Sequence, residues 1–292
     1  MLWKFKMLVK ILVIRFSQLF PSLMSDETYS KLLYFIIFGR KIDMSNPKTF
    51  NEHIIVKKLE DKKLGYDKYT DKYEVRNYVK NCVGDSILND IYGVYDSFDD
   101  IDFSSLPNSF ALKATHASGF NIIVPDKEKL NIKDAKKKFD KWLKINFYYK
   151  DREKNYKNII PRILCDKYID FTDALVEYKI YCFNGKAKLI CQNICKNGNK
   201  YTNVFDENFN FINVRFGHKP IKYSMPNNRE RLIEISEKLS KPFDFVRVDL
   251  YENGGKILFS ELTFHSGGGL VPFHPEKYDF DFAKYFEKED KI

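Results

Sequence analysis

The second half of the chain contains strand-like runs joined by short turns, and these runs constrain the fold more than any other feature. EYKIYCFNGKAKLICQNIC, at residues 177–195, is rich in β-branched and aromatic residues. RVDLYENGGKILFSELT, at 247–263, has two similar runs on either side of Asn-Gly-Gly. Runs this close together pair as hairpins, and the strands of a hairpin are antiparallel. The sequence therefore predicts antiparallel sheet in this half of the chain.

Helical patterns alternate with further strand patterns elsewhere. Residues 1–70 show helical patterns, with Pro47 and Asn51 marking a break. Three more helices are expected, one opening with Thr70 as N-cap, one over 131–146 and one over 228–240. Further strands are expected within 109–124, 161–169 and 203–216. This mixture predicts an α+β fold with largely antiparallel sheets.

Composition limits the kind of protein. A length of 292 residues is consistent with about two domains, and 44% hydrophobic residues can build a core. The net charge of +9 suits an acidic partner such as a nucleotide, an anionic polysaccharide or a membrane face, or else reflects a lysine-rich surface. Nucleic acid is disfavoured because the basic residues are scattered and form no known reader motif. The five cysteines have no paired spacing, which favours a reduced, cytoplasmic protein.

The first 20 residues, MLWKFKMLVKILVIRFSQLF, predict an amphipathic helix. Its charges make the apolar run too short to span a bilayer and unlike a signal peptide. Such a helix can lie on an anionic membrane surface, here the inner membrane face, or pack on the protein's own core. Both interpretations remain open. The apolar face comprises Leu2, Phe5, Leu8, Leu12, Phe16 and Leu19, flanked by Lys4, Lys6, Lys10 and Arg15.

Two acids in the 247–263 stretch point to a metal. Arg247 and Asp249 share one face of the first strand. If Asn-Gly-Gly forms an odd-length loop, Glu261 pairs opposite Arg247 or Asp249 on that face, whereas a two-residue turn would send Glu261 to the other face. Two carboxylates on one face suit Mg²⁺ completed by waters and phosphate oxygens. The alternative is a pair of solvated strand carboxylates.

Two lysines point to phosphate. Lys113 ends the apolar run FALK, and a buried ammonium is costly unless it is paired. The small loop after it, with Ser118 and Gly119, could add backbone N–H donors. Lys72 lies in the first turn of the helix expected after Thr70. Judged singly, Lys72 could be an ordinary surface lysine and the small loop an ordinary hairpin turn.

The order of these motifs resembles the ATP-grasp superfamily, and within it the teichuronopeptide-biosynthesis (TupA-like) group found with bacterial surface-polysaccharide genes. The motifs are NPKTFNE, DKYEVR, LPNSFALKATHASGFNIIV, PRIL, EYKIYCFNGK, RVDLY, ELTFHSGGG and YDFDFA, and they cover most of the chain beyond residue 40. The resemblance implies two α+β subdomains that clasp ATP. It divides the chain into a helical N-terminal region at 1–70, an N-terminal ATP-grasp subdomain at 71–165 and a C-terminal subdomain at 166–292.

The resemblance also implies roles for single residues. Three positions depart from the family pattern: Thr263 stands where Asn is common, Ala117 where Gly is common, and Asp166 where Glu is usual. The implied nucleotide-binding residues are Lys72 and Lys113 on the phosphates, Ser118 and Gly119 on the flap, and Asp166, Lys167, Tyr168 and Ile169 at the adenine hinge. The implied metal and reaction residues are Asp249 and Glu261 on Mg²⁺, Arg247 on the transferred phosphoryl group, Lys179 on the carboxylate, and Ser266 and Gly267 on the oxyanion.

The activity implied is ATP-dependent formation of an amide from a carboxylate and an amine through an acyl phosphate. The carboxylate would be a uronic-acid sugar or an amino acid, in the biosynthesis of a capsule, O-antigen or teichuronic-type polymer. A catalytically silent scaffold of the same fold, which binds polysaccharide or a partner enzyme, is the alternative. A glycosyltransferase is less favoured, because the one Asp-x-Asp, at Asp279 and Asp281, lies outside any evident strand-to-loop site. Neither His116 nor His265 is expected to be a catalytic base.

Overall fold

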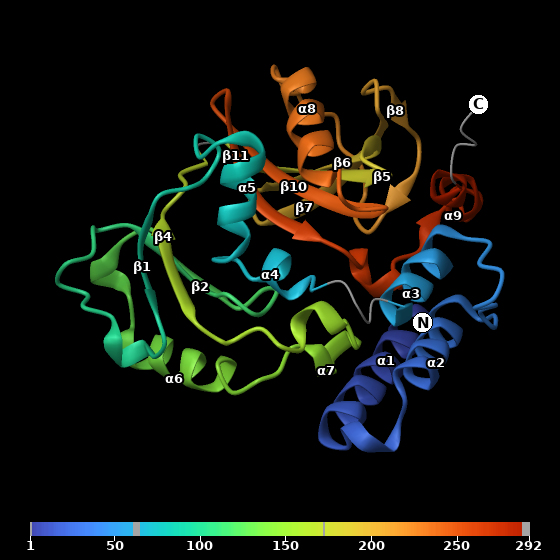
Figure 1. Cartoon of the computed structure of the whole chain (residues 1–292), viewed down its shortest axis with the longest axis horizontal. Helices are drawn as coiled ribbons and strands as arrows, with labels where there is room; N and C mark the ends of the chain where they lie inside the picture. Colours follow the sequence, from blue (N-terminus) through green and yellow to red (C-terminus); the bar gives the residue numbers. More distant parts are fainter. Residues whose placement is uncertain (1, 61–64, 172, 288–292) are drawn as a thin grey trace. The chain divides into compact units, whose positions relative to one another are not determined.

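The computed structural model describes residues 2–60, 65–171 and 173–287, with side chains from Lys6 onward (Figure 1). Its contacts divide the chain into two compact units. Unit 1 comprises residues 1–64, 148–154 and 173–292, and unit 2 comprises 65–147 and 155–172. The boundaries at 70/71 and 165/166 remain a prediction.

Unit 2 is a four-stranded antiparallel sheet with one helix packed on it. The strand order is β1-β4-β2-β3. Helix α6 (Ile132–Trp142) begins at Asn131, whose side chain accepts from the Asp134 N–H. The buried face of α6, with Ala135 and Phe139, packs against sheet residues that include Phe110 and Leu112. The other elements are α4 (Asp67–Thr70), α5 (Val75–Val83), β1 (Ile91–Tyr95), β2 (Phe110–Ala114), β3 (Asn121–Val124), β4 (Ile163–Lys167), η2 (Phe98–Asp100) and η3 (Lys127–Lys129).

Unit 1 is built on a six-stranded antiparallel sheet in the order β11-β10-β5-β6-β7-β8. Its strands are β5 (Leu175–Phe183), β6 (Lys186–Lys196), β7 (Asn199–Asp206), β8 (Phe211–Ile212), β10 (Phe245–Asn253) and β11 (Lys256–Thr263), and a separate pair joins β9 (Arg215–Phe216) to β12 (Phe273–His274). Every strand pair is antiparallel. The predicted α+β class with antiparallel sheets is therefore confirmed.

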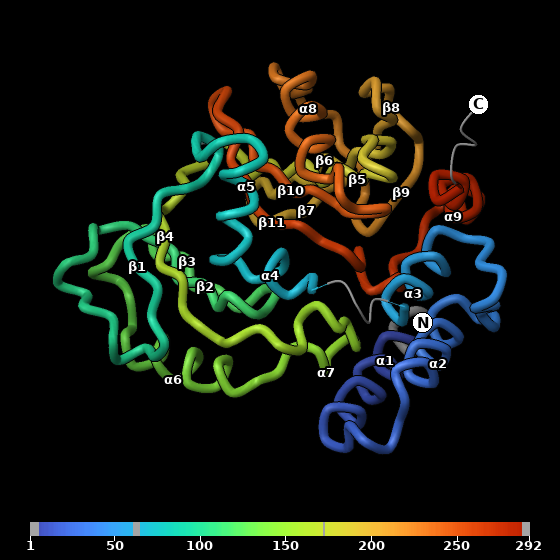
Figure 2. Tube along the Cα trace, in the orientation of Figure 1, coloured from blue at the N-terminus to red at the C-terminus, as the bar shows by residue number. Residues whose placement is uncertain are grey.

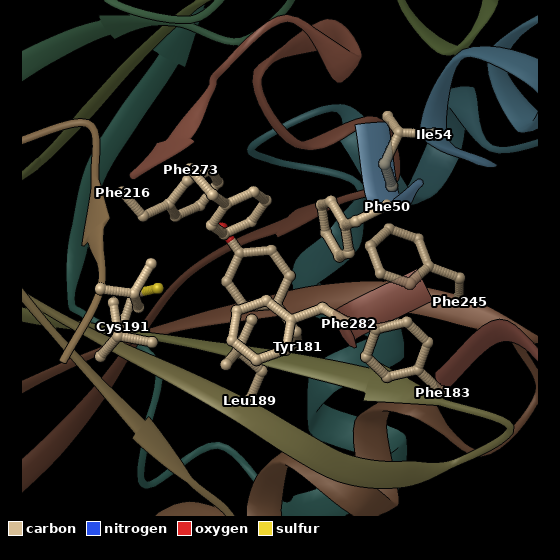
Figure 3. Close-up of a cluster of buried hydrophobic side chains, with 12 residues drawn as sticks. Phe50, Ile54, Tyr181, Phe183, Leu189, Cys191, Phe216, Phe245, Phe273 and Phe282 are labelled. Atoms are coloured by element: carbon tan, nitrogen blue, oxygen red, sulfur yellow. The ribbon is translucent and has the colours of Figure 1, made fainter. Parts of the chain in front are cut away.

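Helices cover both faces of this sheet. Side chains alternate along β5, so Cys182 faces α8 (Arg229–Ser240) while Tyr181 and Phe183 face the other way. The second face is sealed by Phe50 of α3 (Phe50–Glu60), whose ring meets that of Tyr181 edge-on at 5.8 Å (Figure 3). Aromatic residues from α3, the sheet, β12 and η6 (Phe282–Phe286) fill this layer, and α9 (Lys277–Asp281) precedes η6.

The N-terminal helices pack on one another and on α3 (Figure 2). Helix α1 (Leu2–Leu19) is followed by η1 (Pro21–Leu23) and α2 (Asp26–Phe38). The inner side of α1 uses Met7, Val13 and Ile14. The predicted apolar face lies on the opposite side, where Leu8, Leu12, Phe16 and Leu19 are 54%, 57%, 45% and 73% exposed. Among the described residues, no helix is long and apolar enough to cross a membrane.

Fewer cations flank this apolar face than the sequence predicted. Lys6 donates to the Ile37 carbonyl at 3.0 Å, and burial lowers the pKa of Lys10. Arg15 is exposed beside the apolar face, whereas the side chain of Lys4 lies outside the described ones. The exposed stripe is thus more apolar than the sequence suggested.

Two local expectations were wrong. Asn51 lies inside α3, which begins at Phe50, so the break precedes it. Thr70 ends α4, and the N-cap of α5 is Glu74, which makes no side-chain cap hydrogen bond. In the turn between them, Asp71 Oδ1 accepts from the Tyr73 and Glu74 N–H groups at 2.7 and 2.9 Å. Lys72 consequently lies in a turn before α5 and not in a helix.

Candidate functional site

The hairpin of β10 and β11 brings the two predicted metal acids together. Asp249 and Glu261 are direct partners in the register. The turn, however, is the two-residue Gly254-Gly255, because Asn253 pairs with Lys256. If the pairing continued regularly from this turn, Asp249 would pair with Ser260. The register instead shifts between Asp249 and Leu250, so Ser260 is the extra, unpaired residue of a β-bulge. The predicted pairing is right, and the predicted odd-length loop is wrong.

A charged network surrounds Asp249, which is fully buried. Arg247 Nε donates to Asp249 Oδ1 at 2.7 Å, and Arg247 Nη2 donates to Oδ2 at 2.6 Å. Lys179 of β5 also donates to Oδ2, at 3.1 Å, and forms a second ion pair with Glu177 at 3.1 Å. Both oxygens of Asp249 are therefore already bound by cations.

The ionisation of this network follows from its packing. Burial and Arg247 lower the pKa of Lys179, whereas Asp249, Glu177 and Glu261 raise it. The combined effect of the three acids is larger, so the pKa lies above its ordinary value. Burial raises the pKa of Asp249, while Arg247 and Lys179 oppose that shift. Lys179 is thus a permanent cation beside the acids.

Thr263 completes the link between Arg247 and Glu261. Its Oγ1 accepts from Arg247 Nη2 at 3.0 Å and donates to Glu261 Oε1 at 3.0 Å. Arg247 Nη2 also lies 3.4 Å from Glu261 Oε1. The residue that departs from the family pattern therefore orients both the arginine and the outer carboxylate.

The network continues into the glycine loop η5 (Ser266–Gly269). Arg247 Nη1 donates to Ser266 Oγ at 2.9 Å, and the Tyr181 hydroxyl lies 3.0 Å from the same oxygen. Gly267 and Gly269 have left-handed φ values of 58° and 71°. A Cβ on Gly267 would lie 2.5 Å from Val271 Cγ2, and one on Gly269 would lie 2.6 Å from the Asn51 carbonyl oxygen. Only glycine fits these positions.

Unit 2 holds the predicted nucleotide-binding residues. Lys113 of β2 donates to Asp166 Oδ2 of β4 at 2.7 Å, and Asp166 Oδ1 has no hydrogen-bond partner among the described residues. Lys72 Nζ donates to the Ala117 carbonyl at 2.6 Å. The neighbouring Ser118 and Gly119 are exposed at the tip of the β2–β3 hairpin. The two lysines thus contact the predicted hinge acid and the predicted flap.

Backbone groups of the predicted hinge already form hydrogen bonds at Lys167. Lys167 N donates to the Asp90 carbonyl at 2.9 Å, and the Lys167 carbonyl accepts from Asn89 Nδ2 at 2.7 Å. Backbone reading of a base, as the resemblance implies, is therefore left to Tyr168 and Ile169, which follow β4.

Sequence reasoning missed several residues around η5 and the acids. Glu177 lies two residues before Lys179, and this i, i+2 spacing on a strand could have placed both on one face. Glu153 approaches the glycine loop, since a Cβ on Gly268 would lie 3.8 Å from Glu153 Oε1. No local pattern could have found Glu153, because its segment belongs to unit 1 although both flanking segments belong to unit 2.

The oxygen donors of the site meet part of what Mg²⁺ requires. No group of three or more His, Cys, Asp or Glu residues suited to a metal occurs in the part of the chain that the structure describes. Mg²⁺ commonly uses one or two protein carboxylates and takes its other ligands from waters and phosphates. The opposed carboxylates of Asp249 and Glu261 fit such a site. To bind there, Mg²⁺ would replace some of the hydrogen bonds that Arg247 and Lys179 donate to Asp249.

Solved structures resemble the chain at low sequence identity. An L-amino acid ligase from Bacillus licheniformis matches with a TM-score of 0.51 and 11% identity, covering 93% of this chain and 65% of its own. The D-alanine–D-alanine ligase from Helicobacter pylori matches with a TM-score of 0.41 and 15% identity, covering 73% and 59%. The chain thus spans less than two thirds of either protein, and the first match shows a shared fold alone.

A search of curated proteins found no match. The family model described as TupA-like ATPgrasp matches residues 52–287, which is most of the chain and includes every candidate site residue above. The chain belongs to the TupA-like ATP-grasp family.

Proposed function

We propose that the protein is an ATP-dependent carboxylate–amine ligase that forms an amide bond through an acyl phosphate. The observation that carries the proposal is the continuous network from the opposed acids Asp249 and Glu261 through Arg247 to Ser266 of the glycine loop. It combines two opposed carboxylates, a fixed guanidinium and a loop with left-handed glycines in one unit. The fold shared with an L-amino acid ligase supports the same class of reaction.

In unit 1, the acids would hold the metal and the cations would receive the substrate. Asp249 and Glu261 bind Mg²⁺, which neutralises phosphate charge when bound. Arg247 contacts the transferred phosphoryl group, to which its fork of donors is suited. Lys179 binds the carboxylate of the substrate. The backbone N–H groups of Ser266 and Gly267 stabilise the oxyanion.

In unit 2, the lysines would bind the nucleotide. Lys72 and Lys113 contact the phosphates of ATP, and Ser118 and Gly119 cover them as a flap. Asp166, Lys167, Tyr168 and Ile169 form the adenine hinge. The unpartnered Oδ1 of Asp166 supports this assignment, because a ribose hydroxyl would supply the hydrogen bond that it lacks.

Catalysis would rest on positioning and charge. The carboxylate oxygen attacks the γ-phosphorus, and ADP leaves. Arg247 neutralises the charge that develops on the transferred group. The amine then attacks the acyl carbon, and inorganic phosphate leaves. No serine or cysteine nucleophile is needed, and burial raises the pKa of the Cys182 and Cys191 thiols to about 12, which makes them poor nucleophiles.

The substrate class follows from charge and family. The net charge of +9 suits an anionic glycan, and the resemblance to the TupA-like group implies a bacterial surface polysaccharide. We therefore propose a uronic-acid sugar or an amino acid as the carboxylate, in the assembly of a capsule, O-antigen or teichuronic-type polymer in the cytoplasm.

Helix α1 and η1 would attach the protein peripherally to the inner membrane face. Seven large apolar side chains between Leu8 and Leu23 are exposed, and Arg15 lies among them. Leu12→Ser with Leu19→Ser should abolish co-sedimentation with vesicles of phosphatidylglycerol and phosphatidylethanolamine, while Ile123→Ser, at an exposed site in unit 2, should not. Unchanged co-sedimentation of the double variant would disprove this attachment.

The ligase proposal is tested by phosphate release from Mg-ATP across a panel of uronic acids, amino acids and small amines. Lys113→Ala and Glu261→Gln should abolish release, whereas Lys238→Ala, in a surface ion pair of α8, should not. Failure of the wild type to bind ATP would disprove the ligase.

A silent scaffold of the same fold is the second candidate. The observation that favours it is the occupation of both Asp249 oxygens by Arg247 and Lys179. ATP binding without turnover of any substrate pair would support the scaffold. Magnesium-dependent release with even one pair would exclude it.

A further inference from the structure

A second polar cluster lies next to the glycine loop. We call Lys58, Glu153 and His265 the Glu153 cluster. His265 Nδ1 lies 3.9 Å from Glu153 Oε2, and Lys58 Nζ lies 3.4 Å from the Gly268 carbonyl oxygen. Lys58 is fully buried and His265 is 1% exposed. None of these residues has a role in the activation of the carboxylate proposed above.

A strained corner carries Glu153 to this place. Arg152 has a left-handed φ of 57°, which is unfavourable for a long side chain. Its guanidinium is held by the Ser17 hydroxyl at 2.6 Å and the Pro21 carbonyl at 3.2 Å. Arg152 is itself 3% exposed, so α1 and η1 clamp the corner from one side. Strain that is held by several contacts is frequent at functional sites.

The charges around Glu153 suit proton transfer. Burial, then Asp151, raises the pKa of Glu153 to about 8, while Lys58 and Lys150 oppose the shift and Glu261 adds to it. Burial lowers the pKa of Lys58, which Glu153 and Asp151 partly restore. A carboxyl group that exchanges its proton near neutrality is matched to the deprotonation of an amine.

We propose that Glu153 and His265 form the subsite for the acceptor amine, in which Glu153 binds the incoming ammonium group and removes its proton while His265 orients the carboxylate. This inference rests on the proposed ligase function. The loop glycine Gly268 lies over the carboxylate, so the freed amine would be delivered beside the oxyanion donors of Ser266 and Gly267.

The step is balanced. The ammonium R–NH₃⁺ gives one proton to the Glu153 carboxylate and becomes R–NH₂. Its nitrogen lone pair forms the C–N bond, and the C–O bond of the acyl phosphate breaks with its electron pair passing to phosphate. The second proton lost from nitrogen goes to that phosphate, and Glu153 returns its proton to solvent. No further reactant is required.

The kinetic test compares two nucleophiles. Hydroxylamine is already unprotonated at neutral pH and needs no base, whereas L-lysine and D-glucosamine arrive as ammonium ions. With D-glucuronate, D-galacturonate and L-glutamate as carboxylates, Glu153→Gln should form hydroxamate at the wild-type rate. Amide formation with L-lysine or D-glucosamine should fall about 100-fold or more. Glu237→Gln, a hydrogen-bonded acid of α8 in the same unit, should change neither rate.

Two outcomes are separable. Equal loss of both rates in Glu153→Gln would reduce Glu153 to a support for the glycine loop and overturn the subsite. Absence of hydroxamate with the wild type would instead count against the ligase function itself.

A binding measurement needs no turnover. The imidazole signals of His265, followed by NMR during titration with ethanolamine, should shift saturably in the wild type and not in Glu153→Gln. If the wild-type signals do not move at any concentration, the amine subsite is wrong whatever the enzyme does with ATP.

Discussion

At the scale of single residues, Thr263 shows how a departure from a family pattern can be resolved by geometry. An amide side chain at this position would serve as a metal ligand, and its absence suggested weakened metal binding. The structure instead gives Thr263 one hydrogen bond from Arg247 and one to Glu261. Its hydroxyl fixes the outer acid beside the buried one without contributing a further carboxylate.

Thr263→Val should therefore weaken magnesium binding more than it weakens the fold. Valine keeps the shape but removes both bonds, and a bond to a charged group contributes on the order of 2 kcal/mol. The magnesium concentration needed for half-maximal phosphate release should rise about tenfold or more. Thr263→Ser, which keeps the hydroxyl, should restore the wild-type value. An unchanged requirement in Thr263→Val would show that the hydroxyl does not position Glu261.

At the scale of elements, the sequence predicted the β10–β11 hairpin and the pairing of Asp249 with Glu261. It did not predict the β-bulge that produces this pairing. An odd-length loop and a β-bulge each add one unpaired residue to the hairpin. The sequence pattern of alternating apolar and polar residues is the same in both cases, so it cannot distinguish them. Only the pairing of Asn253 with Lys256 distinguishes them. The helices over 131–146 and 228–240 were predictable because each has a strong periodic face. The structure confirms both as α6 and α8, although α6 ends at Trp142 and not at 146.

Deletion of Ser260 tests the bulge. Without this residue a regular hairpin with the same two-residue turn would still place Asp249 opposite Glu261. The main loss is the hydrogen bond from Ser260 Oγ to Glu177 at 2.9 Å, about 1 kcal/mol of unfolding free energy. Deletion of Asn193, in the regular pairing of β6, should invert the faces that follow it and prevent folding. Urea denaturation of both variants is the measurement, and equal damage would contradict the assignment of Ser260.

At the scale of the whole molecule, the sequence could not predict which distant segments build unit 1. Asn51 of α3 donates its N–H and its Nδ2 to Asp279 Oδ1 of α9 at 3.0 and 2.9 Å, across 228 positions. Asp279 belongs to the Asp-x-Asp considered for a glycosyltransferase, and its burial at 1% exposure explains it as a structural acid. Contacts between such distant positions produce no periodic pattern in the sequence. Neither the Asn51–Asp279 contact nor the position of Glu153 could therefore be predicted.

Asp279 should make the stability of unit 1 depend on pH. Burial raises the pKa of Asp279 from 3.8 to about 6, against the hydrogen bonds from Asn51. Between these two pKa values, Asp279 holds a proton in the folded protein but has released it in the unfolded chain. The contribution of Asp279 to the unfolding free energy is therefore full below about pH 4 and is lost as the pH rises through 6. The loss is on the order of 3 kcal/mol. Glu153, with its pKa raised to about 8, adds a similar loss that extends to higher pH.

Urea denaturation of the wild type and Asp279→Asn at intervals from pH 4 to pH 8 separates the two acids. The unfolding free energy of the wild type should fall most steeply between pH 4 and pH 6, and Asp279→Asn should flatten that interval while leaving the decline above pH 6. Glu153→Gln should do the reverse, flattening the upper interval more than the lower. A variant Asp279→Asn whose slope matches the wild type below pH 6 would mean that the Asn51 bonds keep Asp279 ionised in the fold, and the link between α3 and α9 would then be a charged one.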